Sequence, residues 1–255
     1  MNDTIITLDS CTKELDAVTA ELQTLPPGRL VKRGTFYNHV VNRKEVGITG
    51  HATLIRQLCR KSYLLARKKL LDRNISIMSL PTTKLNSATP KETISSLPNT
   101  YQGLPDSYFY HSSIEPWLAA PYPKNPFPLK GTEGIKSENG ITFRSKSEYI
   151  IADILNSYNI PYRYEDAITL GGKRLFPDFK TKNPYNGKLI IWEHFGGLNL
   201  PGYGSKMNEK MVLYMKHGYI PFKNLICTFE PDIQNTQLLR NLVENIILQA
   251  NYLSK

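Results

Sequence analysis

The chain has 255 residues, of which 40% are hydrophobic and 21% are charged, and this is an ordinary composition for a globular protein with one sizeable domain and a smaller module. No apolar run reaches membrane-spanning length, the N-terminus lacks a signal-like pattern, and the three cysteines lie far apart, so we expect a reduced, cytoplasmic protein without a membrane partner. The formal net charge of +10 favours an acidic partner such as nucleic acid.

The first 74 residues predict a small basic module. Apolar residues at helical spacing indicate a packing helix over residues 8–25, which a Pro-Pro-Gly sequence ends. Residues 29–48 are rich in β-prone side chains and predict a β hairpin with its turn at Asn42-Arg43-Lys44. A long amphipathic helix is expected over residues 53–73.

This module holds the whole excess of positive charge. Between Gly28 and Arg73 there are 12 Lys or Arg residues against two acidic residues, and the rest of the chain is balanced. We therefore expect the module to contact the phosphates of nucleic acid, with DNA as the first expectation, although a solvated helix or a site for an acidic protein partner fits the same charges. The predicted nucleic-acid-binding residues of the helix are Arg56, Arg60, Lys61, Arg67, Lys68 and Lys69. A homodimer or a partner subunit remains open.

Residues 75–140 predict a linker followed by an extended arm. Ser, Thr and Asn dominate up to about residue 100, and nine of the 17 prolines lie between Pro81 and Pro128. The aromatic residues after Thr100 are too numerous for a free linker, so we expect them to anchor an arm on the C-terminal domain. Stacking on unpaired bases is the alternative.

Residues 141–255 predict an α/β domain with a mixed sheet flanked by helices. The expected elements are a helix from Ser145, a strand over 162–170, a strand ending at Asp178, a strand ending at Glu193, a helix over 203–217, a strand over 224–229 and a helix over 236–253. Their order is helix, three strands, helix and strand.

Two acidic residues mark the ends of neighbouring strands in this domain. The turn around Asn183 and Gly187 folds two apolar runs into a hairpin, which leaves Asp178 and Glu193 side by side at its open end. Adjacent strands lie about 5 Å apart, so the two carboxylates can share one hard cation, Mg²⁺ or Mn²⁺. The alternative is two strand-end acids that simply face water, but their apolar flanks disfavour it.

Pro177-Asp178 and the block Trp192-Glu193-His194-Phe195-Gly196 together resemble the PD-(D/E)xK nuclease superfamily. The resemblance covers roughly residues 143–230 and implies the restriction endonuclease-like αβββαβ fold and metal-dependent hydrolysis of phosphodiester bonds. It also implies that Asp178 and Glu193 hold the metal and that Glu148, on the first core helix, joins them. A capping box with Ser145 is an equally good interpretation of Glu148.

The chain departs from this family at Phe195, because the family has a lysine at that position. The helix that follows offers Lys210, which we rank first as a replacement, and then Lys206; a solvated helix face is the alternative for both. His194 ranks third, as a proton shuttle, since alternation places it on the opposite face from Glu193. The Trp-Glu-His-Phe-Gly block followed by a helix with Tyr and Lys is similar to a bacterial and mobile-element subgroup, which implies a defence or mobile-element context.

Two other functions fit the sequence. The missing lysine is compatible with a non-catalytic nucleic-acid-binding protein on a degenerate nuclease fold. The basic module is also compatible with an interaction subunit of a larger complex.

Overall fold

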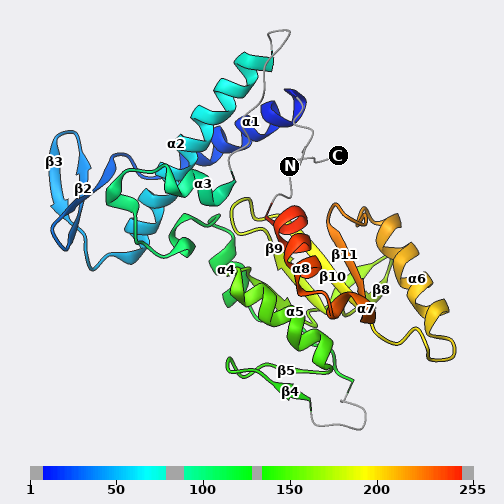
Figure 1. Ribbon diagram of the computed structural model, residues 1–255. Helices are drawn as coiled ribbons and strands as arrows, with labels where there is room; N and C mark the ends of the chain where they lie inside the picture. Colours follow the sequence, from blue (N-terminus) through cyan, green and yellow to red (C-terminus); the bar gives the residue numbers. More distant parts are fainter. Residues whose placement is uncertain (1–7, 79–88, 128–133, 249–255) are drawn as a thin grey trace. The chain divides into compact units, whose positions relative to one another are not determined.

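A computed structural model describes residues 8–78, 89–127 and 134–248. The chain is mixed α/β and separates into two compact units, one up to residue 111 and one from residue 112 to 250 (Figure 1). The expected linker and arm, residues 75–140, are therefore divided between the two units, and parts of them, residues 79–88 and 128–133, lie outside the described residues.

The first unit contains two long helices and a small antiparallel sheet. Its main elements are α1 (Leu8–Thr24), β1 (Arg29–Arg33), β2 (Phe36–Val41), β3 (Lys44–Gly47) and α2 (Ala52–Met78). Both predicted helices are confirmed. The sheet has three strands in the order β1-β2-β3, where one hairpin was predicted, because Gly34 adopts a left-handed conformation with φ of 60° and turns the chain a second time.

Helical turns occur where the sequence predicted a linker and then an extended arm. They are α3 (Pro90–Ser95) and two 3-10 turns (Asn99–Tyr101 and Asp106–Phe109), all in the first unit, and α4 (Ile114–Ala119) in the second. A capping box begins α3: the Thr89 hydroxyl accepts from the Glu92 amide at 3.2 Å, and the Glu92 carboxylate accepts from the Thr89 amide at 2.6 Å. Together with Pro90 at the first helical position, these local signals outweigh the composition.

The second unit is built around a four-stranded mixed sheet. Its further elements are β4 (Ile135–Lys136), β5 (Thr142–Phe143), α5 (Lys146–Ser157), β6 (Tyr162–Tyr164), β7 (Ile168–Leu170), β8 (Lys173–Leu175), β9 (Phe179–Lys182), β10 (Leu189–Phe195), α6 (Tyr203–Lys216), β11 (Leu225–Phe229), α7 (Glu230–Ile233), α8 (Thr236–Leu242) and a π-helical turn (Val243–Ile247). The strand order is β11-β10-β9-β6, and only the β10–β11 pair is parallel, with α6 as its crossover.

Two strand boundaries were predicted wrongly. The run over 162–170 is not one strand, because Glu165 takes a left-handed φ of 49° and separates β6 from β7, which pairs with β8 in a hairpin of its own. Asp178 does not end the second strand; it directly precedes β9. The helix predicted over 236–253 is described only to residue 248, and its later residues lie outside the described part.

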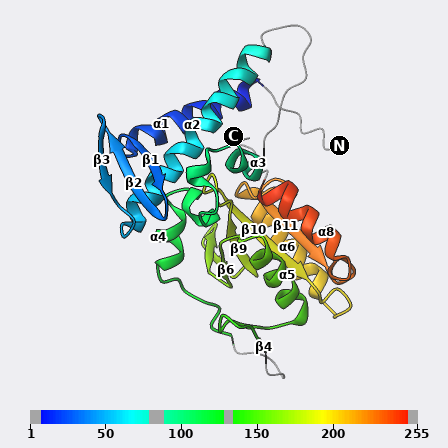
Figure 2. The ribbon, with the colours of Figure 1, turned by 60° about the vertical axis from the view of Figure 1, so that its left-hand side comes forward.

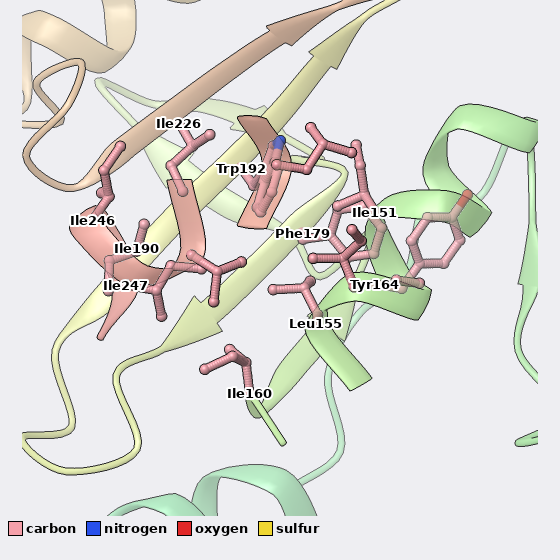
Figure 3. Close-up of a cluster of buried hydrophobic side chains, with 14 of the residues drawn as sticks. Ile151, Leu155, Ile160, Tyr164, Phe179, Ile190, Trp192, Ile226, Ile246 and Ile247 are labelled. Atoms are coloured by element: carbon pink, nitrogen blue, oxygen red, sulfur yellow. The ribbon is translucent and has the colours of Figure 1, made fainter. Parts of the chain in front are cut away.

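Helices cover both faces of the sheet. On one face, residues of α5 and of the C-terminal helical segment pack with Phe179, Ile190 and Trp192 in a buried cluster (Figures 2 and 3). On the other face, Tyr214 of α6 packs with Ile191. Since side chains alternate along β10, Glu193 points with Ile191 toward α6, while the next residue points with Trp192 toward α5.

Candidate active site

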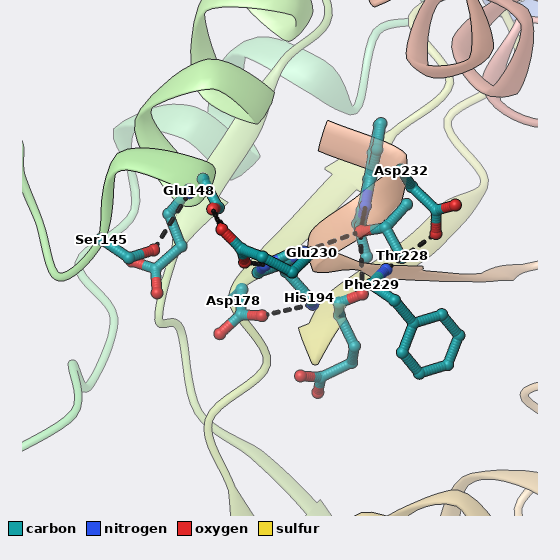
Figure 4. A network of polar contacts seen from close by, with 11 residues as sticks. Ser145, Glu148, Asp178, His194, Thr228, Phe229, Glu230 and Asp232 are labelled. Atoms are coloured by element: carbon teal, nitrogen blue, oxygen red, sulfur yellow. Dashed lines mark hydrogen bonds and ion pairs between the residues drawn. The ribbon is translucent and has the colours of Figure 1, made fainter. Parts of the chain in front are cut away.

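The strand register brings Asp178 and Glu193 to the same place. Phe179 pairs with Trp192 in the β9–β10 ladder, so the next positions outward, Asp178 and Glu193, lie opposite each other on the α6 face. The backbone amide of His194 donates to the Asp178 carboxylate at 2.6 Å and fixes its orientation (Figure 4). The predicted convergence of these two residues thus has a structural basis in the ladder.

The β9–β10 turn sets this register. The Asn183 side chain accepts hydrogen bonds from the amides of Tyr185 at 2.8 Å and Asn186 at 3.1 Å. Its own amide group donates to the Ile247 carbonyl at 2.5 Å and ties the turn to the C-terminal helical segment. The Asn183 side chain therefore bonds both the turn itself and the C-terminal helical segment, and these hydrogen bonds hold the two strands that carry the acids in one register.

Glu193 is only 1% exposed, and α6 supplies partners for both of its carboxylate oxygens. Lys210 donates to Oε2 at 2.7 Å, and the Tyr214 hydroxyl donates to Oε1 at 2.5 Å. The two donors stand four residues apart and therefore share one face of the helix. Lys206, one turn earlier, is exposed. Of the two lysines predicted as replacements, Lys210 is the one that reaches Glu193.

Charge is crowded at this point. Burial raises the pKa of Asp178 well above its ordinary value, and the neighbouring Glu193 raises it further. Burial acts to lower the pKa of Lys210, but the carboxylates of Glu193 and Asp178 outweigh this effect, so the pKa of the ammonium group is raised. Burial, and then the charge of Glu193, also raise the pKa of Tyr214. Two acids therefore share one protonated lysine.

Glu148 lies close enough to raise the pKa of Asp178, but its carboxylate has other partners. Its Oε2 atom accepts from the Tyr164 hydroxyl at 2.5 Å and from the Arg144 amide at 2.9 Å. Only half of the predicted capping box is present: the Ser145 hydroxyl accepts from the Glu148 amide at 3.2 Å (Figure 4). Among the described residues, no three His, Cys, Asp or Glu side chains form a group able to hold a metal ion.

The His194 ring belongs to a different polar network, on the α5 face. Its Nε2 atom lies 2.9 Å from Glu230 Oε2, and its Nδ1 atom lies 3.3 Å from the Thr228 hydroxyl (Figure 4). Ser147 of α5 donates to Glu230 at 3.0 Å, and the hydrogen bond from His194 lowers the pKa of Glu230. This network joins β10, β11 and α5, and it explains the position of the ring without a proton-transfer role.

Aromatic residues form the remaining surroundings of the two acids. Phe195, at the position of the missing lysine, is 4% exposed, and its ring centroid lies 5.9 Å from that of Phe229. The Tyr203 ring lies against Gly197 so closely that a Cβ atom on this glycine would come within 2.6 Å of it. Burial raises the pKa of the Tyr203 phenol; the nearby charge of Asp178 raises it further, and that of Lys210 lowers it.

The basic residues predicted to contact nucleic acid are largely engaged within the first unit. Arg60 is 3% exposed, and it donates to Glu21 at 2.7 and 2.8 Å and to the Phe109 carbonyl at 3.0 Å. The other contacts are Arg67 with Glu14, Lys61 with the Pro26 carbonyl, Lys68 with Asp72, and Arg56 over the Tyr108 ring. Lys69 is exposed. Arg60 and Arg67 therefore join α1 to α2.

Sequence reasoning missed Tyr214 as a partner of Glu193 and Tyr164 as a partner of Glu148. It also missed Thr228 and Glu230, which belong to the separate network of the His194 ring. Tyr214 had a signal, because it lies four residues after Lys210 on the same helical stripe. The others meet their partners through contacts between distant parts of the chain; His194 and Glu230, for example, are 36 residues apart.

Comparison with protein-family models, with curated proteins and with solved structures finds no significant match for this chain. Within the described residues, no helix combines the length and the apolar character needed to cross a membrane.

Proposed function

We propose that the second unit is a metal-dependent nuclease that hydrolyses phosphodiester bonds, with DNA as its substrate. One observation carries the proposal: Asp178 and Glu193 stand opposite each other at the ends of paired strands, and Lys210 donates to Glu193 at 2.7 Å. Two acids and a lysine at one sheet edge are the side chains that the PD-(D/E)xK resemblance requires. Here the lysine comes from the helix after the strand.

The order and direction of the core elements support the same proposal. Helix α5 precedes an antiparallel β6-β9-β10 set, and α6 then leads to β11, which is parallel to β10. This is the helix, three strands, helix and strand order that the resemblance implies, with the β7–β8 hairpin inserted between the first two strands. We therefore infer a restriction endonuclease-like core.

The donor set fits a hard divalent cation. Mg²⁺ is commonly held by one or two carboxylates, with water and substrate phosphate as the other ligands, so Asp178 and Glu193 suffice as protein side chains. Burial, and then the neighbouring charge of Glu193, raise the pKa of Asp178, and a bound cation would offset both effects by favouring the carboxylate. When bound, Mg²⁺ or Mn²⁺ supplies Lewis acidity and lowers the pKa of a coordinated water. Glu148 remains a candidate for orienting a water molecule.

The chain's own residues then have separate tasks. Lys210 places an ammonium group where it can donate to a phosphate oxygen and offset the charge that develops in the transition state. Tyr214 holds Glu193, and the amide of His194 holds Asp178, so both carboxylates are oriented before substrate arrives. The resemblance to a bacterial and mobile-element subgroup supports a role in defence against foreign DNA or in mobile-element processing.

Cleavage assays with isosteric variants test the proposal. Wild-type protein, Asp178→Asn, Glu193→Gln and the control Glu230→Gln would be incubated with supercoiled, linear and single-stranded DNA in Mg²⁺, Mn²⁺ or EDTA. We expect divalent-dependent cleavage that falls at least a hundredfold in the first two variants, since each loses a charged metal ligand, and that persists in Glu230→Gln. Equal cleavage by wild type and both site variants would refute the assignment.

The second candidate is a non-catalytic nucleic-acid-binding protein on the same fold. The buried position of Phe195 against Phe229 favours it, because this pair fills the place of the usual lysine with core packing. Salt-sensitive binding of DNA without any cleavage in Mg²⁺ or Mn²⁺ would support this function instead.

A further inference from the structure

The positive charge of the first unit is divided between α2 and the β1-β2-β3 sheet, and only part of it is available to a partner. Most basic side chains of α2 are engaged with α1, with backbone carbonyls or with Tyr108, as described above. Arg43 and Lys44, at the β2–β3 turn, are exposed, and neither side chain makes a hydrogen bond or ion pair within the part of the chain that the structure describes. The turn is therefore one basic surface that the fold leaves uncommitted, and the exposed Lys69 and Arg73 on α2 form a second one against which it can be compared.

The conformation of the turn is unusual for an arginine. Val41 pairs with Lys44, so Asn42 and Arg43 are the two central residues, and both adopt left-handed conformations with φ of 49° and 67°. This is the type I′ geometry of tight hairpins, in which Asn followed by Gly is preferred. An arginine at the second position is disfavoured relative to glycine, and such strained residues concentrate at functional sites.

The hairpin is also placed to reach a large partner. Leu30 of β1 is 2% exposed and belongs to the core of the unit, whereas Val46 of β3 is 62% exposed. β3 is the outer strand of the sheet, and Figure 1 shows it at the outer edge of this unit, away from α1 and α2. A two-stranded β ribbon is narrow enough to enter the major groove of duplex DNA, where charged tip residues lie beside the phosphates.

We propose that the β2–β3 hairpin, through Arg43 and Lys44 at its tip, is the surface by which this protein binds double-stranded DNA. The inference rests on the proposed function for its choice of DNA as the partner. It adds to that function by assigning the main contact with DNA to the hairpin instead of the basic helix α2. The tip carries a guanidinium group and an ammonium group but no aromatic ring, which suits phosphate contacts on a duplex rather than stacking on unpaired bases.

Two double variants with the same change in net charge test the inference. Full-length Arg43→Glu/Lys44→Glu and Lys69→Glu/Arg73→Glu would be titrated against a fluorescent 25-base-pair duplex in EDTA, so that no cleavage occurs, at several salt concentrations. We expect the hairpin variant to bind at least tenfold more weakly than wild type and its salt slope to fall by about 1.8, or 0.9 for each lost phosphate contact. The helix variant, which keeps the tip, should remain within about threefold of wild type.

A third variant separates binding from folding. Arg43→Gly removes the charge and suits the left-handed position, so we expect unchanged or higher thermal stability together with several-fold weaker binding. Hairpin variants that bind duplex within threefold of wild type, an equal loss in the helix variant, or a loss confined to single-stranded DNA would each overturn the inference.

These results are independent of the cleavage assays. If the hairpin variants bind normally while Glu193→Gln still abolishes cleavage, only the hairpin inference fails. If wild type never cleaves but the hairpin variants lose binding, the inference holds and the nuclease proposal fails.

Discussion

Replacing Lys210 with methionine tests the electrostatic description of the site. Methionine keeps most of the length of the side chain and removes the ammonium group that donates to Glu193 at 2.7 Å. The variant leaves Glu193, which is 1% exposed, beside Asp178 without a compensating charge. Removing one partner of a buried ion pair is strongly destabilising, because the other charge stays buried.

The expected cost follows from the geometry. The ammonium nitrogen lies 2.7 Å from Oε2, and at that separation two unit charges at an effective dielectric constant of about 20 interact by about 6 kcal/mol. The Lys210 side chain keeps 24% of its exposure, so water screens part of this interaction, and the variant also avoids the burial of an ammonium group. We therefore expect the free energy of unfolding of the second unit to fall by about 2 to 3 kcal/mol.

Tryptophan fluorescence during urea unfolding measures this unit selectively, because both tryptophans of the chain, Trp117 and Trp192, belong to it. The titration would be run at pH 7 in EDTA. Lys206→Met is the matched control, since Lys206 is exposed on the same helix, and it should change stability by less than about 0.5 kcal/mol. Adding Glu193→Gln to Lys210→Met should restore at least about 1 kcal/mol. A Lys210→Met protein within about 0.5 kcal/mol of wild type would refute the reasoning.

Three further variants probe other contacts. Tyr214→Phe removes the hydroxyl that donates to buried Glu193, so we expect a loss of about 2 kcal/mol in the same urea assay, and a loss below about 0.5 kcal/mol would contradict this. Arg60→Met removes the guanidinium group that donates to Glu21 of α1 and should cost the first unit about 3 kcal/mol by circular dichroism melting; an unchanged melting temperature would be inconsistent with it. The backbone and side-chain hydrogen bonds with Thr89 lower the pKa of Glu92. The stability that the Glu92 carboxylate adds to α3 is therefore fully present above its unfolded pKa of about 4.3, and it is lost as the pH falls through the lower folded pKa. Hydrogen exchange should therefore show that Glu92→Gln weakens α3 at pH 7 and that this difference from wild type shrinks as the pH falls into the acid range; the same difference at every pH would count against the capping box.

The acidic pair could be predicted from the sequence because its causes are local. A turn centred on Asn183 fixes the register of the two flanking strands, and register alone places Asp178 opposite Glu193. Lys210 could be predicted for a similar reason, since helical periodicity decides which side chains after the strand point back at it. The strand boundaries near Glu165 were missed because one residue in a left-handed conformation ended a run of β-prone residues.

The basic helix shows what composition cannot reveal. The lysines and arginines of this helix were predicted to contact nucleic acid because they are so many. In the structure Arg60 pairs with Glu21, 39 residues away, and Arg67 pairs with Glu14, 53 residues away. Such pairing depends on how α1 packs on α2, and no local pattern reports it. The turn at Arg43 was predicted correctly from the sequence. Whether its charge is available to a partner could be judged only from the structure, which shows that Arg43 is exposed while most basic residues of α2 are engaged.

The central claim is that Asp178 and Glu193 hold one divalent cation. Isothermal titration of the metal-stripped protein with Mn²⁺ tests it directly, with Asp178→Asn, Glu193→Gln and the control Glu230→Gln measured alongside. We predict one Mn²⁺ bound by wild type and by Glu230→Gln, and at least a hundredfold weaker binding by the other two variants, because each loses a charged ligand oxygen. Binding of Mn²⁺ by Asp178→Asn and Glu193→Gln with the affinity and stoichiometry of wild type would contradict the account.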